Sequence, residues 1–254
     1  MKHLTVTPLP NFPLIHPGDD LAGLIFANLQ KNEISLQDGD VLVLAQKIVS
    51  KSEGRLVNLA DVKPSARAVE LAAETDKDPR VVELILAESN EIVRTRPGLI
   101  VVEHKNGFVC ANAGIDHSNV KSNQTNETVL LLPEDSDRSA EEIRQKLQES
   151  GGARIGILII DSHGRAWRMG TVGMTIGISG LPGLVDLRGE DDLFGRTLQI
   201  TQVGAADELA AAASLMMGQA DEGTPVVHVR GFPYPLRESN LDELLRPKEQ
   251  DLFR

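Results

Sequence analysis

Two aspartates at the ends of apolar segments are the residues best placed to do chemistry in this sequence. Asp116 follows a predicted strand and the turn NAG, and Asp161 ends the apolar run GILII. A carboxylate at a strand end is held by rigid backbone and can still reach a cleft. Two such carboxylates that converge could bind Mg²⁺ or Mn²⁺, which prefer oxygen ligands. The alternative is that each aspartate only caps a turn or a helix N-terminus, where Asp is common.

Two further segments carry side chains suited to an anionic ligand. The segment MGQADEG places Gln219, Asp221 and Glu222 directly after a predicted helix, and QKIVSK carries Lys47 and Lys51. Lys51 could act on a phosphate as a point charge if it points into a cleft. Taken alone, each segment favours a structural interpretation: a glycine-capped helix followed by a solvated acidic turn, and a solvated strand end.

Composition limits the classes of partner. The chain has 254 residues, a formal net charge of −11 and 3% aromatic residues. Such a charge disfavours nucleic acid and anionic membranes, and few aromatic residues disfavour a stacking surface for single-stranded nucleic acid. An anionic ligand would therefore need local compensation by a divalent cation, by Lys or Arg, or by backbone N–H groups.

Several familiar sites are absent from the sequence. It contains no G-x-x-x-x-G-K-S/T loop, and GISG is not a nucleophile elbow. The single cysteine, Cys110, excludes an intrachain disulfide and is expected to be buried rather than nucleophilic. Because no apolar run approaches the roughly 18 residues of a membrane helix and no secretory signal is recognisable, we expect a cytoplasmic protein.

The elements that must position these residues are strands and helices in irregular order. Apolar patterns predict strands at 3–9, 41–45, 92–95, 99–104, 128–133, 153–161 and 225–231, and helices at 21–29, 64–76, 79–89, 206–217 and 241–245. Asn106-Gly107 predicts a β-hairpin over 99–112. Pro64 and Pro79 suit first helical positions, and Ser139 with Glu142 predicts a capping box for a helix that ends at Gly151-Gly152. The lack of a strand–helix–strand repeat favours an α+β fold.

Six blocks of the sequence resemble the coenzyme F420-0:L-glutamate ligases, a family that adds glutamate to a deazaflavin cofactor. They are FPLIHPGDDL, DGDVLVLAQKIVSKSEGR, CANAGIDHSNV, IGILIIDSHGRAWRMGTVGMTIGISG, DLFGR and LMMGQADEG. The resemblance covers almost the whole chain. It implies one domain over 1–254 with an α+β mixed-sheet fold of two closely packed subdomains, an intertwined homodimer, and no C-terminal nitroreductase-like domain of the kind that some bacterial relatives carry.

The resemblance also implies roles for individual residues. It places nucleotide contacts at Phe12, Pro13, Leu14, Ile15, Ala45, Gln46, Lys51, Asn119, Met217, Gly218, Gln219, Ala220, Asp221, Glu222, Gly223 and Thr224. It places metal ligands at Asp116, Asp161, Ser162 and Gln219, and catalytic roles at Asp116, Asp161 and Lys51. Ser162 stands where relatives carry Thr, which keeps a hydroxyl, and Gln219 stands where some carry Glu, so its amide brings no charge to a second metal. His163, at a position where Asn is familiar, receives no role.

The implied reaction joins L-glutamate to the cofactor precursor at the expense of GTP, through an acyl phosphate, with release of GDP and phosphate. The resemblance implies two Mg²⁺ or Mn²⁺ ions per site, with K⁺ as a further candidate ion, and positive charge from Lys51 together with Arg165 or Arg168. Two alternatives stay open. A metal-dependent phosphohydrolase would use the same acids with water as the nucleophile, and a non-catalytic module would bind GTP without turnover.

Overall fold

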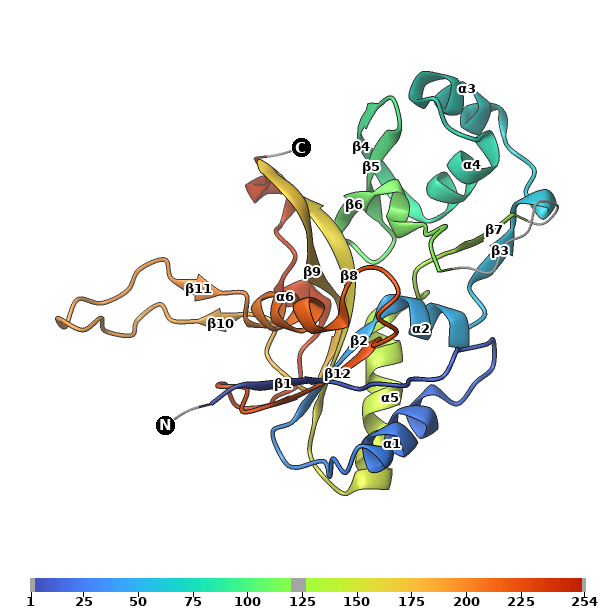
Figure 1. The fold of residues 1–254 in the computed structure, drawn as a ribbon. Helices are drawn as coiled ribbons and strands as arrows, with labels where there is room; N and C mark the ends of the chain where they lie inside the picture. The colour runs from blue at the N-terminus through green and yellow to red at the C-terminus, as the bar shows by residue number, and fades with distance from the viewer. Residues whose placement is uncertain (1–2, 120–126, 253–254) are drawn as a thin grey trace.

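A five-stranded mixed sheet forms the centre of the protein in the computed structural model, which describes residues 3–119 and 127–252 (Figure 1). The strand order is β1-β12-β2-β8-β9. The strands are β1 (Thr5–Pro8), β12 (Val226–Arg230), β2 (Val41–Ala45), β8 (Gly156–Arg165) and β9 (Arg168–Ser179). Strands β2 and β8 run parallel, and the other neighbouring pairs run antiparallel. The mixed sheet, with its helices, confirms the predicted α+β class.

Strand β2 and the first half of β8 are the buried centre of this sheet. Their apolar runs lie inside the core because helices cover the sheet. Helix α5 (Ser136–Gly151) packs on β8 and β9, and α6 (Ala205–Met217) packs on β9, β1 and β12. The glycines of GTVGMTIG allow these close approaches: a Cβ on Gly173 would lie 2.5 Å from Ser214 of α6, and one on Gly177 would lie 2.5 Å from the Ser136 carbonyl oxygen of α5.

A second lobe packs beside the central sheet, at the upper right of Figure 1. It contains a three-stranded antiparallel sheet of β4 (Ser89–Arg96), β5 (Leu99–His104) and β6 (Val109–Ala111), with α3 (Ala66–Thr75) and α4 (Pro79–Ala87) beside it. The pairing of β5 with β6 confirms the hairpin that Asn106-Gly107 predicts, and Gly107 has the positive φ that the turn requires. Cys110 on β6 is buried, as expected, and burial raises the pKa of its thiol to about 12.

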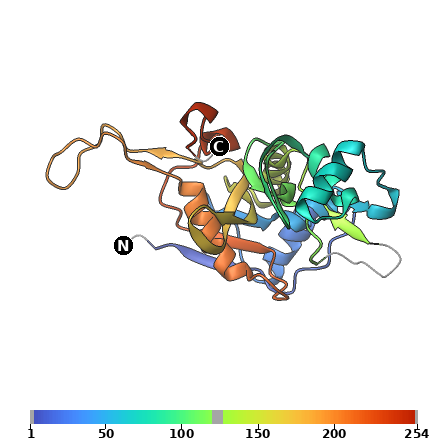
Figure 2. The same cartoon turned by 90° about the horizontal axis from the view of Figure 1, so that it is seen from above.

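The remaining elements connect and extend these two lobes. Within residues 3–119 and 127–252 they are α1 (Leu21–Lys31), α2 (Gln46–Ser52), β3 (Leu56–Asn58) paired with β7 (Thr128–Leu130), β10 (Val185–Asp186) paired with β11 (Gln202–Val203), and the 3₁₀ turns η1 (Leu59–Asp61), η2 (Asn112–Gly114), η3 (Leu241–Glu243) and η4 (Lys248–Gln250). The arm is the long excursion of residues 185–203 around β10 and β11, and it projects away from the body in both views (Figures 1 and 2). No helix in the described part of the chain is long and apolar enough to cross a membrane.

Two predictions about helix starts are wrong. Helix α5 begins at Ser136, where Asp135 caps it by accepting a hydrogen bond from the Arg138 N–H, so Ser139 lies inside the helix instead of opening a capping box with Glu142. Pro79 is the first residue of α4, as predicted, but Pro64 precedes the cap of α3, because Ser65 fills that position.

The predicted strand end at QKIVSK is also wrong, because this segment forms helix α2 directly after β2. Ala45 occupies the cap position with extended backbone and makes no side-chain hydrogen bond. The usual Ser, Thr, Asp or Asn that announces a helix is therefore missing from this sequence.

Candidate functional site

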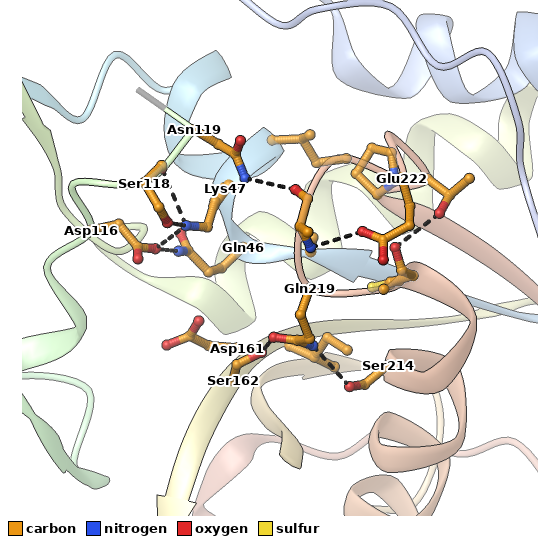
Figure 3. A pocket seen from close by; sticks show the side chains of 18 of the residues that line it. Gln46, Lys47, Asp116, Ser118, Asn119, Asp161, Ser162, Ser214, Gln219 and Glu222 are labelled. Atoms are coloured by element: carbon orange, nitrogen blue, oxygen red, sulfur yellow. Dashed lines mark hydrogen bonds and ion pairs between the residues drawn. The ribbon is translucent and has the colours of Figure 1, made fainter. Parts of the chain in front are cut away.

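A pocket of about 630 Å³ opens where β2 ends beside the middle of β8 (Figure 3). These strands are parallel neighbours, and Ala45 at the end of β2 pairs with Ile160 of β8. Gln46, which follows β2, therefore lies near Asp161. The predicted strand end at Asp161 is wrong, because β8 continues to Arg165 and Asp161 pairs with Met174 of β9. Every residue to which the resemblance assigns a nucleotide contact, a metal ligand or a catalytic role lines this pocket: Phe12, Pro13, Leu14, Ile15, Ala45, Gln46, Lys51, Asp116, Asn119, Asp161, Ser162, and Met217 through Thr224.

Asp116 is held in place by helix α2. The Gln46 amide donates a 2.7 Å hydrogen bond to Asp116 Oδ2, and the Ser50 hydroxyl donates to Gln46 Oε1 at 2.9 Å. Gln46 is only 1% exposed, so this chain of hydrogen bonds is fixed within the core. Lys47 adds an ion pair, with Nζ at 2.9 Å from the same Oδ2. The backbone of Asp116 is tied to Leu130 by two hydrogen bonds of 2.9 Å.

The turn that delivers Asp116 has an unusual backbone. Asn112, Ala113 and Gly114 all have positive φ, between 51° and 65°. Ala113 disfavours this left-handed region because of its Cβ, and such strain is often found where a fold positions a functional group. The turn ends β6 and brings the chain back to pair with Leu130. The turn therefore directs Asp116 to the pocket edge.

The charge environment of Asp116 favours a cation. Burial raises the pKa of its carboxyl group, and the nearby Asp161 carboxylate raises it further. The charge of Lys47 lowers this pKa, and so do the hydrogen bonds from Lys47 and from the Gln46 amide. The net pKa lies above the usual value. Two partly buried carboxylates that share one pocket gain from a shared cation, because it relieves both their desolvation and their mutual repulsion.

The opposite wall combines β8 with the loop after α6. Ser162 donates a 2.8 Å hydrogen bond to Gln219 Oε1, and the Gln219 amide lies 3.4 Å from Ser214 Oγ. His163 is a buried residue that also lines the pocket, with Nε2 3.2 Å from Asp161 Oδ2. The hydroxyl and amide oxygens predicted as ligands are therefore neighbours.

The loop of residues 217–224 closes the pocket and contacts the turn after Asp116. The Glu222 carboxylate accepts a 2.8 Å hydrogen bond from the Ala220 N–H, which folds the loop on itself. The Asn119 amide donates to the Ala220 carbonyl at 3.4 Å, and Lys51 Nζ donates to the Asn119 carbonyl at 2.8 Å. Lys51 thus stands at the junction of these two segments, where burial and the charge of Lys47 lower its pKa.

Sequence reasoning missed some of the pocket and placed other residues wrongly. Ser118 and Ser214 line it although neither received a role from the sequence, and Lys47 lines it although the resemblance assigned it none. Recognition of helix α2 would have shown that Lys47 and Lys51, four residues apart, share a helix face. Arg165 and Arg168 do not line the pocket, since they lie exposed at the far end of the β8–β9 hairpin.

The donor set fits a hard divalent cation. Across residues 3–119 and 127–252, no three His, Cys, Asp or Glu side chains gather as a metal centre. The pocket instead offers oxygen atoms, from the carboxylates of Asp116 and Asp161, the Ser162 hydroxyl and the Gln219 amide. Oxygen ligands of this kind suit Mg²⁺ or Mn²⁺, which retain water, better than Zn²⁺, which prefers nitrogen and sulfur.

Comparison with known proteins yields one consistent result. The family F420-0:gamma-glutamyl ligase matches residues 11–231. The chain is 47% identical over 253 residues to a coenzyme F420:L-glutamate ligase of Methanothermobacter thermautotrophicus, with 99% of each chain covered. It is 49% identical over 219 residues to one from Methanococcus maripaludis, covering 86% of each chain. It is 43% identical over 249 residues to one from Archaeoglobus fulgidus, covering 98% of this chain and 96% of the relative.

Proposed function

Because the chain belongs to the F420-0:gamma-glutamyl ligase family, we propose that it uses GTP to add L-glutamate to the terminal carboxylate of a coenzyme F420 precursor. The γ-phosphoryl group of GTP moves to the precursor carboxylate, which yields an acyl phosphate and GDP. The amine of glutamate attacks the acyl carbon, the phosphate leaves, and the nitrogen loses a proton. Activation is needed because a free carboxylate is a poor electrophile at neutral pH.

The observation that supports this proposal best is the convergence of separate segments on one pocket. Residues from the loop before α1, from α2, from the turn after β6, from β8 and from the loop after α6 all line it. Its volume, about 630 Å³, lies within the range of small-molecule sites. A nucleotide and an acceptor carboxylate could therefore be held in one chamber, as phosphoryl transfer requires.

The residues of the pocket would have different roles according to their charge. Asp116, Asp161, Ser162 and Gln219 would hold divalent cations, which supply charge neutralisation at the phosphates when bound. Lys51 adds a positive charge at the loop of residues 217–224, where it would face a bound phosphate. Gln46 keeps Asp116 in a fixed orientation. Local positive charge of this kind is what allows a protein of net charge −11 to bind a triphosphate.

One reaction mixture separates this function from the two alternatives. The protein is incubated with GTP, Mn²⁺, L-glutamate and the precursor, and the products are analysed by mass spectrometry and by phosphate release. We expect a glutamyl mass increment on the precursor, together with phosphate release that depends on both glutamate and precursor. Phosphate release without either co-substrate would indicate a phosphohydrolase instead, and GTP binding without turnover would indicate a binding module.

We also propose that the arm takes part in an intertwined homodimer. Leu193, Phe194 and Ile200 on the arm are 98%, 94% and 87% exposed, and an arm that projects from the body can reach a second copy. Light scattering after size exclusion should give a dimer for the wild type and a monomer for Phe194→Asp. Leu252→Asp, at an exposed site outside the arm, is the matched control and should stay dimeric. A dimeric Phe194→Asp variant would count against the arm.

A further inference from the structure

Lys47 occupies the place beside Asp116 where a cation would be expected. Its Nζ lies 2.9 Å from Asp116 Oδ2 and donates to the Ser118 hydroxyl at 2.7 Å and to the Ser118 carbonyl at 3.3 Å (Figure 3). Asp116 Oδ2 also accepts from the neutral Gln46 amide. In the described part of the chain, Lys47 is therefore the cationic side chain in direct contact with this carboxylate.

A divalent cation and the Lys47 ammonium compete for this carboxylate. Asp116 brings a single negative charge, and the ammonium already neutralises it. A divalent cation at either carboxyl oxygen would lie a few ångströms from that ammonium, and like charges repel strongly in a partly buried pocket. Both side chains are only about a quarter exposed, at 26% for Lys47 and 25% for Asp116, so water screens this repulsion weakly.

We propose that Lys47 is an internal counter-ion that holds Asp116 in the metal-free protein and must leave it when a divalent cation binds. This inference rests on the proposed function, since it takes Asp116 as a metal ligand. The released ammonium needs another anion inside the same pocket, and a nucleotide phosphate would provide one. Lys47 therefore couples the two ligands: nucleotide should draw Lys47 away and so strengthen cation binding at Asp116.

The neighbouring lysine gives a control for this idea. Lys51 lies one turn further along α2, lines the same pocket and carries the same charge. Its ammonium donates to the Asn119 carbonyl at 2.8 Å instead of contacting the carboxylate. Removal of either lysine makes the pocket more negative, but only removal of Lys47 takes away a direct competitor for Asp116.

The first experiment measures Mn²⁺ binding without nucleotide, by electron paramagnetic resonance of the free ion. We expect Lys47→Met to lower the dissociation constant for Mn²⁺ roughly tenfold, because one close repulsion is lost. Lys51→Met should change it by no more than about threefold, since its charge lies further from Asp116. Lys47→Arg, which keeps the charge, should bind Mn²⁺ like the wild type. Circular dichroism checks that each variant is folded.

The second experiment repeats the titration with GDP, which binds without turnover. GDP should strengthen Mn²⁺ binding in the wild type, and this gain should be smaller in Lys47→Met. The proposal is overturned if Lys47→Met binds Mn²⁺ no more tightly than the wild type. It is also overturned if Lys51→Met increases the affinity for Mn²⁺ as much as Lys47→Met does. If the wild type glutamylates the precursor but Lys47→Met shows no increase in affinity for Mn²⁺, this inference alone is refuted. If Lys47→Met binds Mn²⁺ more tightly but the wild type shows no ligase reaction, the proposed function is refuted instead.

Discussion

Loss of Arg230 should strongly destabilise the fold, because it leaves a buried carboxylate without its main partner. Asp40 stands just before β2, is 1% exposed, and accepts hydrogen bonds from Arg230 Nε at 2.9 Å and Nη2 at 2.7 Å. His228 Nε2 lies 2.9 Å from the same carboxylate, and the Gln37 N–H donates to it at 2.9 Å. The pair thus joins the start of β2 to β12.

The magnitude follows from burial. Breaking a buried ion pair by removing one partner typically costs 3–5 kcal/mol. We expect no more than the low end for Arg230→Leu, about 3 kcal/mol of the free energy of unfolding, because the Arg230 side chain is 39% exposed and His228 and Gln37 still face the carboxylate. Burial alone would raise the pKa of Asp40, but the hydrogen bonds from Arg230, His228 and Gln37 hold it well below its usual range. This contribution is therefore present above about pH 4 and is lost as the pH falls below that value.

Urea unfolding at a fixed protein concentration measures this effect. Far-UV circular dichroism is the suitable signal, because the single tryptophan, Trp167, is 88% exposed and reports poorly on the core. Arg188→Leu is the matched control: Arg188 makes the same forked pair with Asp186, but on the exposed arm. It should leave the free energy of unfolding nearly unchanged, since solvent screens exposed pairs. Equal losses in the two variants would refute the burial argument.

Three further predictions concern the site, acid stability and packing. Asp161→Asn, folded and assayed with saturating Mn²⁺, should lose roughly 10²-fold or more in ligase rate, as for removal of one electrostatic stabiliser. Near-full activity of this variant would exclude Asp161 as a metal ligand. Burial lowers the pKa of His104 to about 4, helped by the charges of Arg55 and Lys105. The contribution of neutral His104 to the free energy of unfolding is complete above about pH 6.5. It falls by up to about 3 kcal/mol towards pH 4, because in this range only the unfolded chain takes up the proton. The free energy of unfolding of His104→Gln should therefore depend less on pH. Gly177→Ala should cost about 1–3 kcal/mol through overpacking against α5, whereas Gly164→Ala, which meets open space, should melt like the wild type.

The central sheet and the pocket edge were predictable for a physical reason. The runs VLVLA and GILII are too short for helices and too apolar for one-sided strands, so they had to be buried strands. A carboxylate at the end of such an apolar run is held by rigid backbone and can still reach a cleft. That reasoning reached Asp116 and Asp161 from pattern alone, and the family resemblance supplied most of the other pocket residues. All of those residues line one cavity.

Other features depend on contacts that no local pattern encodes. Helix α2 begins without a capping side chain, so the pattern suggested a strand end and hid the position of Lys47. The start of α5 was misplaced because Ser139 and Glu142 imitate a capping box, while Asp135 performs the capping. The arm has only two-residue strands, β10 and β11, at its base, too short to leave a periodic signal.

The position of β12 sets a constraint on synthesis at the ribosome. This strand, near the end of the chain, lies between β1 and β2, which emerge first, so the sheet has an empty slot until residues 226–230 arrive. A sheet whose paired strands are far apart in the sequence folds slowly and leaves unpaired strand edges, which are prone to aggregation, exposed in the nascent chain. Because the loop of residues 217–224 leads directly into β12, the insertion that completes the sheet also closes the last wall of the pocket.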